Sequence, residues 1–237
     1  MRWCLEDVER AIRQARNKIT PVADEIIEEL KIPKNTDVFV VGGFVRDAVL
    51  CELTKQNSES KDIDLILSEK PDLSQNPNIV WKKENSFGGI KVKTKKFPEI
   101  DIFDKYLDWP GIIVGQYFDF NFNSIYYHNK TKSILAAAPF YGFTSNKKIE
   151  LINYQVVDDG IKILYSDPSL VSRALKFKLL FQQKYKIDAS LSDFILYLIY
   201  NMDKKTEQEM LKYTQQKIKD EILRRQIINE YYKIKCL

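Results

Sequence analysis

Two aspartates separated by one residue, Asp62 and Asp64, have a side-chain type and a spacing that suit catalysis or metal binding. Residues two apart on a β-strand point to the same face of a sheet, so these carboxylates could share one divalent cation. Hard oxygen ligands select Mg²⁺ or Mn²⁺ rather than zinc. An acidic pair alone is a weak signal, because such pairs commonly lie in solvated turns. A metal site therefore needs support from further residues.

Two adjacent glycines, Gly42 and Gly43, precede the acidic pair and separate an apolar run from a stretch with helical spacing. Glycines let the backbone approach a ligand closely, and a helix N-terminus offers free N–H groups to phosphate oxygens. The alternative is a tight turn from strand to helix with no ligand. A phosphate cradle beside metal-binding carboxylates would suit phosphoryl or nucleotidyl transfer, which depends mainly on positioning and charge neutralisation.

A two-metal mechanism needs a third carboxylate, and Glu99, Asp101 and Asp104 lie in or beside one predicted strand. We expect Asp101 to serve, because the isoleucines on either side of it make one strand face apolar and the other acidic. Glu99, on the same face, is the alternative.

Hydrophobic spacing predicts the elements that position these residues. Strands are expected at 37–41, 62–67, 79–83, 89–94 and 99–103, and a helix at 44–53. Residues 4–31 are expected to form two helices, the second beginning at Thr20 and Pro21. For 118–128 the periodicity favours neither strand nor helix.

After residue 168 the apolar residues have helical spacing, and helices are expected at 169–186, 191–201 and 207 to about 234. Ser190 is expected to cap the second of these, and a capping box of Thr206 and Glu209 the third. We therefore predict an α+β fold with a mixed, mostly antiparallel sheet followed by a helical C-terminal region. The expected domains are 1–165 and 166–237.

Composition fits a globular protein, with 237 residues of which 44% are apolar. Three widely spaced cysteines argue against a disulfide framework and fit a cytoplasmic location. No signal peptide or membrane span is predicted. The single histidine, His128, could be a general base, but an isolated histidine more often packs or lies at the surface.

The string Gly42-Gly-Phe-Val-Arg-Asp47, followed by Lys61-Asp-Ile-Asp-Leu65, resembles the signature of class II tRNA nucleotidyltransferases (CCA-adding enzymes) and bacterial poly(A) polymerases. Phe87-Gly-Gly89 with Glu99-Ile-Asp101, and Asp167 to Phe177, resemble later family segments in order. The resemblance covers roughly residues 37 to 190. It implies a polymerase-β-like nucleotidyltransferase head, an NTP or dNTP substrate with adenylate favoured, and two Mg²⁺ or Mn²⁺ ions held by Asp62, Asp64 and Asp101.

The resemblance also implies which residues bind the nucleotide, with the glycines on the triphosphate. These residues are Gly42, Gly43, Arg46, Asp47, Asp119, Asn123 and Arg173. The family string R-R-D-F-T-I-N corresponds to 117–123, where both arginines are replaced. That replacement leaves the choice between ribonucleotide and deoxyribonucleotide open. No segment clearly matches E-D-x-x-R, the family's protein template for C and A.

The expected acceptor is a single-stranded nucleic acid or a tRNA 3′ end, and no membrane partner is expected. Three alternatives remain. The enzyme could make short oligonucleotide signals, for instance in phage defence, or it could transfer a nucleotide to a protein or a small molecule. The head could also be an inactive nucleotide-binding module.

Overall fold

The computed structural model describes residues 3–57, 62–84, 89–103, 118–152, 154–157, 160–163 and 168–236. They belong to two compact units: residues 1–117 with 123–141, and residues 118–122 with 142–237. The motif residues Lys61, Phe87, Gly88, Tyr117 and Asp167 lie outside the described residues. The division into a catalytic head (1–165) and a helical domain (166–237) stays a prediction.

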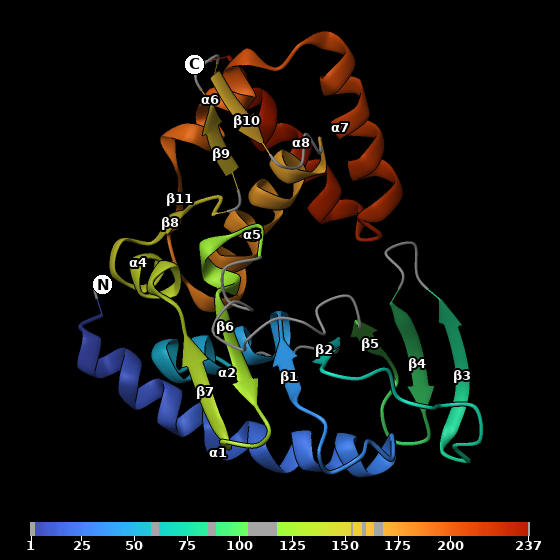
Figure 1. The fold of residues 1–237 in the computed structure, drawn as a ribbon. Helices are drawn as coiled ribbons and strands as arrows, with labels where there is room; N and C mark the ends of the chain where they lie inside the picture. Colours follow the sequence, from blue (N-terminus) through green and yellow to red (C-terminus); the bar gives the residue numbers. More distant parts are fainter. Residues whose placement is uncertain are drawn as a thin grey trace. The chain divides into compact units, whose positions relative to one another are not determined.

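The first unit is built on a seven-stranded sheet with the strand order β3-β4-β5-β2-β1-β6-β7 (Figure 1). The strands are β1 (Val38–Val41), β2 (Ile63–Leu67), β3 (Ile79–Glu84), β4 (Ile90–Thr94), β5 (Ile100–Phe103), β6 (Ile125–His128) and β7 (Ser133–Ala136). Strands β2 and β5 run parallel, and the other neighbouring pairs are antiparallel. The predicted mixed, mostly antiparallel sheet is therefore confirmed.

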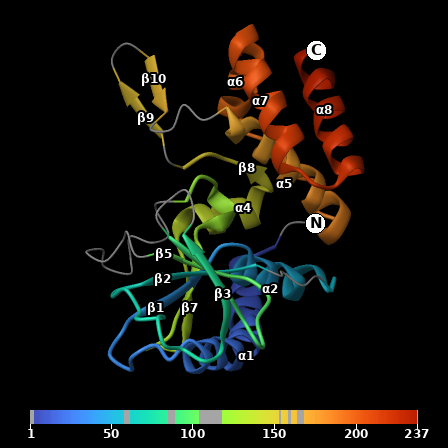
Figure 2. The same ribbon diagram turned by 90° about the vertical axis from the view of Figure 1, so that its right-hand side faces the viewer.

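Two helices, α1 (Leu5–Glu29) and α2 (Gly43–Thr54), lie along one face of this sheet (Figures 1 and 2). The prediction of two helices over 4–31 was wrong, because α1 continues through Pro21. A proline inside a helix costs about 3 kcal/mol. A continuous buried stripe that includes Ile12, Ile19 and Ile26 offsets this cost, since it packs both halves of the helix.

Alternation along the central strands separates apolar side chains from acidic ones. In β2, Ile63 and Leu65 are buried, and in β5, Ile100 and Ile102 are buried. Asp64 lies between the first two, so its side chain points to the opposite face. The strand period that predicted a shared acidic face therefore operates in both strands.

The segment whose periodicity was ambiguous contains two kinds of structure. A short 3₁₀ turn, η1 (Asn121–Asn123), precedes strand β6, which forms a hairpin with β7. Helix α4 (Ala138–Asn146) follows. The segment that the periodicity left undecided therefore forms a strand only from residue 125 onward.

The described part of the second unit contains four further helices and short strands. These are α5 (Ser169–Tyr185), α6 (Asp193–Asn201), α7 (Lys204–Lys217), α8 (Glu221–Lys235), β8 (Lys148–Ile149), β9 (Tyr154–Val157), β10 (Gly160–Ile163) and β11 (Ser190–Leu191). Strand β8 pairs with β11 in parallel, and β9 pairs with β10 in antiparallel orientation. The predicted helical C-terminal region is confirmed. None of the helices in the described ranges is long and apolar enough to cross a membrane.

Two predicted helix starts in this unit were wrong, and a third start was missed. Ser192, not Ser190, caps α6, and its hydroxyl accepts a hydrogen bond from the Ile195 amide at 3.3 Å. The single helix expected from residue 207 is two helices, because Asp220 caps the N-terminus of α8. Asp203 caps α7 and accepts a hydrogen bond from the amide of Thr206 at 2.7 Å. Aspartate competes with serine and threonine for such positions, so spacing alone did not locate the caps.

Candidate active site

The turn between β1 and α2 brings the backbone against an acidic side chain. Gly42 has φ 72° and ψ −142°, a conformation that residues with a Cβ rarely adopt. A Cβ added to Gly42 would lie 2.5 Å from Asp64 Oδ2, which is too close for two non-bonded atoms. Glycine is therefore required here for both its backbone angle and its lack of a side chain. The start of α2 at Gly43 presents the free amides of a helix N-terminus beside this carboxylate.

The carboxylates predicted to hold metal lie on neighbouring strands. Val41 of β1 pairs with Asp64 of β2, and Asp64 pairs with Asp101 of the parallel strand β5. Asp62 lies immediately before β2 and is exposed. Its negative charge acts on Asp64, as does that of Asp101. The structure therefore brings the three predicted acids into one electrostatic neighbourhood.

Lys91 is a residue of this site that sequence reasoning missed. It lies opposite Asp101 in the β4–β5 pair, and its Nζ is 3.1 Å from Asp101 Oδ2. The same ammonium contacts the Glu99 carboxylate. Both candidates for the third acid thus share one lysine. The signal was present in the predicted strands, but it required the register between them.

Among the carboxyl groups of the described residues, Asp64 is the one most perturbed by its surroundings. Burial raises its pKa, and the negative charges of Asp101 and Asp62 raise it further, to about 7. Lys91 and Arg46 act in the opposite direction without cancelling the effect. Perturbed pKa values of this kind cluster at functional sites, where charges are held together for chemistry.

The donor chemistry of this site fits a hard divalent cation. Within the described ranges, no group of three or more histidine, cysteine, aspartate or glutamate side chains is placed to hold a metal ion, so Asp62, Asp64 and Asp101 do not together form a metal-binding group in this structure. Mg²⁺ commonly uses one or two carboxylates together with substrate phosphates and water, rather than a cage of protein ligands. Asp62 and Asp64 beside the Gly42 turn supply such a partial set.

Three of the predicted nucleotide-pocket residues form one buried network. The Arg46 side chain donates from Nε to Asp47 Oδ1 at 2.6 Å and from Nη1 to Asn123 Oδ1 at 2.8 Å. All three residues are less than a tenth exposed. The Arg46 amide also donates to the carbonyl of Gly42 at 3.3 Å. This network therefore fixes the first turn of α2 directly behind the glycine turn.

The remaining predicted residues, Asp119 and Arg173, belong to the second unit. They form an ion pair with each other, and the Arg173 guanidinium lies 5.5 Å from the centre of the Phe120 ring. The structure thus brings two motif residues together from segments more than fifty positions apart in the sequence. Their role in nucleotide binding stays a prediction.

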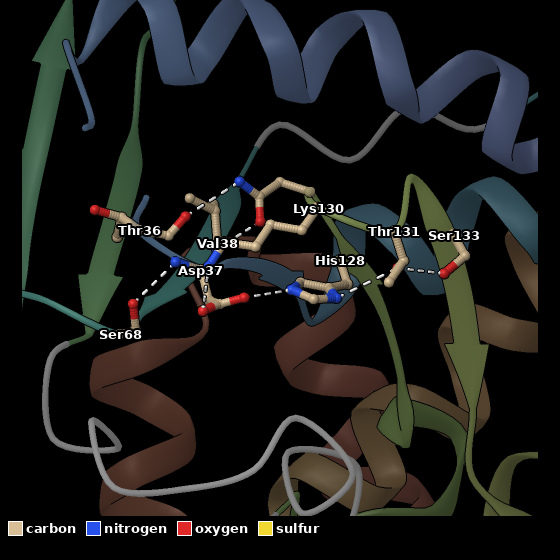
Figure 3. Close-up of polar contacts among 9 residues, drawn as sticks. Thr36, Asp37, Val38, Ser68, His128, Lys130, Thr131 and Ser133 are labelled. Atoms are coloured by element: carbon tan, nitrogen blue, oxygen red, sulfur yellow. Dashed lines mark hydrogen bonds and ion pairs between the residues drawn. The ribbon is translucent and has the colours of Figure 1, made fainter. Parts of the chain in front are cut away.

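A second polar cluster surrounds the beginning of β1, at the other end of that strand from Gly42 (Figure 3). Asp37 Oδ1 lies 2.8 Å from His128 Nε2, and Lys130 Nζ donates to Asp37 Oδ2 at 2.7 Å. The His128 ring stacks on Phe39, with 4.7 Å between ring centres. Thr131 Oγ1 lies 3.3 Å from the other ring nitrogen, His128 Nδ1. These contacts assign His128 a packing role.

The charge environment of Asp37 is the reverse of that of Asp64. Burial would raise the pKa of Asp37, but hydrogen bonds from Lys130 and His128 outweigh it and hold the pKa below its ordinary value. Asp37 is therefore a carboxylate whose charge the fold itself compensates.

No protein-family model matches the sequence, and no curated protein matches it. Solved structures do match. A CCA-adding enzyme in complex with ATP aligns with a TM-score of 0.61 and 16% identity over 96% of this chain and 54% of that one. The Thermotoga maritima CCA-adding enzyme complexed with tRNA aligns with a TM-score of 0.61, 14% identity and the same coverages. A tRNA-processing enzyme in its apo form aligns with a TM-score of 0.60 and 15% identity over 92% and 56% of the two chains.

These likenesses show that the chain has the fold of CCA-adding enzymes, as the α+β prediction required. The chain spans about half the length of the solved structures that it matches.

Proposed function

We propose that this protein is a metal-dependent, template-independent nucleotidyltransferase. It joins a nucleoside monophosphate, with adenylate favoured, from an NTP or dNTP to the 3′ hydroxyl of a nucleic acid and releases pyrophosphate. One observation carries the proposal: the Gly42 turn leaves no room for a side chain against Asp64 Oδ2, 2.5 Å from the position of a Cβ. This contact joins a phosphate-binding type of turn to a perturbed, buried carboxylate in a fold shared with CCA-adding enzymes.

In this proposal, Asp62 and Asp64 hold Mg²⁺ or Mn²⁺, and Asp101 is the third carboxylate of the site. A bound divalent cation would neutralise phosphate charge and polarise the phosphorus–oxygen bonds of the substrate. The burial and crowding of Asp64 support its role, because a cation relieves the repulsion that raises its pKa. Asp101 accepts the proton of the acceptor hydroxyl, with the Lys91 ammonium fixing the orientation of its carboxylate.

The triphosphate is bound by the backbone of Gly42 and Gly43 and by the free amides at the start of α2. The buried network of Arg46, Asp47 and Asn123 holds this turn in place, and within it the Arg46 charge is paired with Asp47. A rigid turn matters because phosphoryl and nucleotidyl transfer depend mainly on positioning and electrostatics. We also propose that the Asp119–Arg173 pair contributes to nucleotide binding.

The acceptor and location extend the proposal further. CCA-adding enzymes that share this fold have been solved with ATP, with CTP and with tRNA, which supports an NTP substrate and a single-stranded or tRNA 3′ end as acceptor. None of the three cysteines forms a disulfide, which supports a reducing compartment such as the cytoplasm.

The test is incorporation of label into a primer. Purified protein is incubated with Mg²⁺ or Mn²⁺ and each labelled NTP or dNTP in turn, with a single-stranded RNA, a single-stranded DNA, a tRNA or no primer. We expect primer lengthening, fastest with ATP, that disappears in the Asp62→Asn/Asp64→Asn double variant. Asp37→Asn is the matched control, because it removes a carboxylate charge at the other end of β1 and should leave incorporation intact.

The other outcomes identify the alternatives. Oligomers formed without primer would replace terminal transfer by synthesis of a short oligonucleotide signal. Label on a protein or small molecule would show that the acceptor is that molecule and not a nucleic acid. No incorporation under any condition, together with nucleotide binding, would overturn the proposal in favour of an inactive binding module.

A further inference from the structure

A row of residues runs across the outer half of the sheet in register with the carboxylates of the site. Asp64 pairs with Asp101, Asp101 pairs with Lys91, and Lys91 pairs with Lys83 of the edge strand β3. Residues paired directly across strands share a face. The ion pair between Lys91 and Asp101 shows that β4 and β5 keep this shared face. The face that carries the proposed catalytic acids therefore continues to the edge of the sheet.

An exposed aromatic residue lies in the same hairpin. Trp81 is 41% exposed and pairs with Lys93, whose Nζ lies 5.8 Å from the centre of the indole ring. Lys93 is two residues from Lys91 on β4, so both side chains point to the same face. Lys83 is likewise two residues from Trp81 on β3. These three exposed residues, Trp81, Lys83 and Lys93, are called the lysine–tryptophan strip below.

Protection of an edge strand does not account for the strip. Lysines on an edge strand block pairing with other chains, and they can do so from either face. That role gives no reason for a half-exposed indole beside a lysine. The opposite face of the same hairpin carries Lys82, whose cross-strand partner Val92 is fully buried, and the acidic Glu84. Only the face of the strip combines an exposed aromatic ring with unmixed positive charge on these two strands.

We propose that the lysine–tryptophan strip binds the acceptor strand as a single-stranded nucleic acid. Trp81 stacks on a base, Lys83 and Lys93 contact phosphates, and the 3′ end is directed along the row toward Asp64. Aromatic rings with flanking lysines are the combination that binds single strands without reading their sequence. The inference rests on the proposed function, since the row gives the strand its direction.

The spacing of the sheet fits this assignment. Neighbouring strands lie 4.7–4.9 Å apart, so the three steps from β2 through β5 and β4 to β3 place Lys83 roughly 14 Å from Asp64. That interval accommodates a few nucleotides of a single strand. Lys91, between the two, contacts Asp101 and Glu99 and leaves the phosphate contacts to the outer lysines.

The test measures binding alone, in EDTA and without nucleotide. Fluorescence anisotropy of a labelled ten-nucleotide single-stranded RNA is followed with wild-type protein, Trp81→Ala, Trp81→Phe and Lys83→Gln/Lys93→Gln. We expect Trp81→Ala to raise Kd on the order of tenfold to a hundredfold, and Trp81→Phe to restore most of the affinity. The lysine double variant should lower the slope of log K against log salt by roughly 1.4, the value for two lost phosphate contacts to a single strand.

Lys82→Gln is the matched control, because it removes one exposed charge from the same strand on the opposite face. Circular dichroism checks that each variant is folded, and the lysine variant keeps the test decisive if Trp81→Ala unfolds. Unchanged Kd and salt slope in the strip variants, or an equal loss in Lys82→Gln, would overturn the proposal. Loss of a concentration-dependent dimer in the strip variants, with RNA binding intact, would also overturn it in favour of pairing between edge strands.

The two proposals fail separately. RNA binding that depends on the strip, without nucleotide incorporation, would support the proposed binding surface and contradict the proposed transferase activity. Nucleotide incorporation with an unchanged KM for primer in the strip variants would support the proposed transferase activity and contradict the proposed binding surface.

Discussion

Two carboxylates with pKa values shifted in opposite directions lie beside the two ends of strand β1. At its beginning, Asp37 receives hydrogen bonds from Lys130 and His128, which hold its pKa below the ordinary value. Opposite its last residue, Val41, the half-buried Asp64 of β2 lies near other carboxylates, and its pKa is raised to about 7. Asp37 immediately precedes β1 and Asp64 is the second residue of β2, so both lie in neighbouring parts of the same sheet. The difference lies in whether the fold supplies the compensating charge.

This contrast separates a structural polar cluster from a functional one. A carboxylate whose partners are all in the protein stabilises the loop around it and needs no ligand (Figure 3). A buried carboxylate crowded by like charges costs free energy that the rest of the fold must supply. Natural proteins keep such groups where a ligand uses them. The comparison therefore supports the proposal that the chemistry is centred on Asp64, and not on Asp37 or His128.

Exchange of each aspartate for asparagine should give the largest difference. We expect Asp64→Asn to lower kcat/KM for nucleotide incorporation roughly a thousandfold or more, because it removes a cation ligand. Asp37→Asn should leave kcat/KM within a factor of about two and cost on the order of 1–2 kcal/mol of stability in urea unfolding. Equal activity losses in the two variants would remove the distinction between the two ends of β1.

A methyl group at Gly42 tests the contact with Asp64 directly. Gly42→Ala should lower kcat/KM about a hundredfold and destabilise the protein by about 1–3 kcal/mol, because the Cβ meets Asp64 Oδ2 and the positive φ is strained. Gly142→Ala is the matched control, since a Cβ there meets nothing within 4 Å. It lies inside α4, where alanine should be neutral or stabilising by up to about 1 kcal/mol. Activity and urea midpoints are measured for both, and a harmless Gly42→Ala would contradict the close approach.

The two carboxylates should give stability profiles of opposite sign in metal-free protein. Asp64 has a raised folded pKa, so its contribution is present at low pH and is lost as the pH rises through about 7. In urea unfolding, the free energy of unfolding of Asp64→Asn relative to that of wild type should rise between pH 5 and pH 8, by on the order of 2–4 kcal/mol.

Asp37 has a lowered folded pKa, so its contribution is present above pH 4 and is lost as the pH falls further. Asp37→Asn should therefore be less stable than wild type above pH 4, and this difference in the free energy of unfolding should disappear only in acid. A parallel pH profile for both variants would show that the two environments are alike.

The lysines beside the two carboxylates should produce the smallest effect. Lys91→Met removes a positive charge 3.1 Å from Asp101 Oδ2, so Mn²⁺ should bind about threefold to tenfold more tightly. Lys130→Met removes the corresponding charge at Asp37 and should leave Mn²⁺ affinity unchanged. Titration followed by electron paramagnetic resonance measures both. Weaker Mn²⁺ binding in Lys91→Met would show that the lysine supports the metal site rather than competing with it.

The local parts of the fold were readable from the sequence because their signals are local. The glycine pair at 42 and 43 marks the end of β1 and the start of α2, and the period of two in β2 places Asp62 and Asp64 on one side. Helix boundaries were less readable. Pro21 stays inside α1 because buried packing outweighs its local preference. Asp203 caps α7 in place of the expected Thr206, and the sequence did not predict the separate helix α8, which Asp220 caps.

The parts of the site that sequence reasoning missed depend on register. Asp101 was selected from the alternation within one strand, and the structure places it opposite Asp64. Lys91 lies opposite Asp101 only because of the way residues 95–99 connect β4 to β5. A shift of one residue would have placed Lys91 on the other face. The partners of Asp37 are similarly non-local, since His128 and Lys130 are ninety positions away in the sequence.

The parallel pairing of β2 with β5 has a consequence for how the molecule folds. Asp64 and Asp101 are paired although the β3–β4 hairpin lies between them in the sequence, and Arg46 bonds to Asn123, 77 positions away. Such contacts join distant parts of the chain, and they form late because closing long loops costs entropy before the contacts form. A nucleotide or cation that requires all of these residues binds the completed first unit and none of its precursors. Its binding energy therefore adds to the stability of the native state alone.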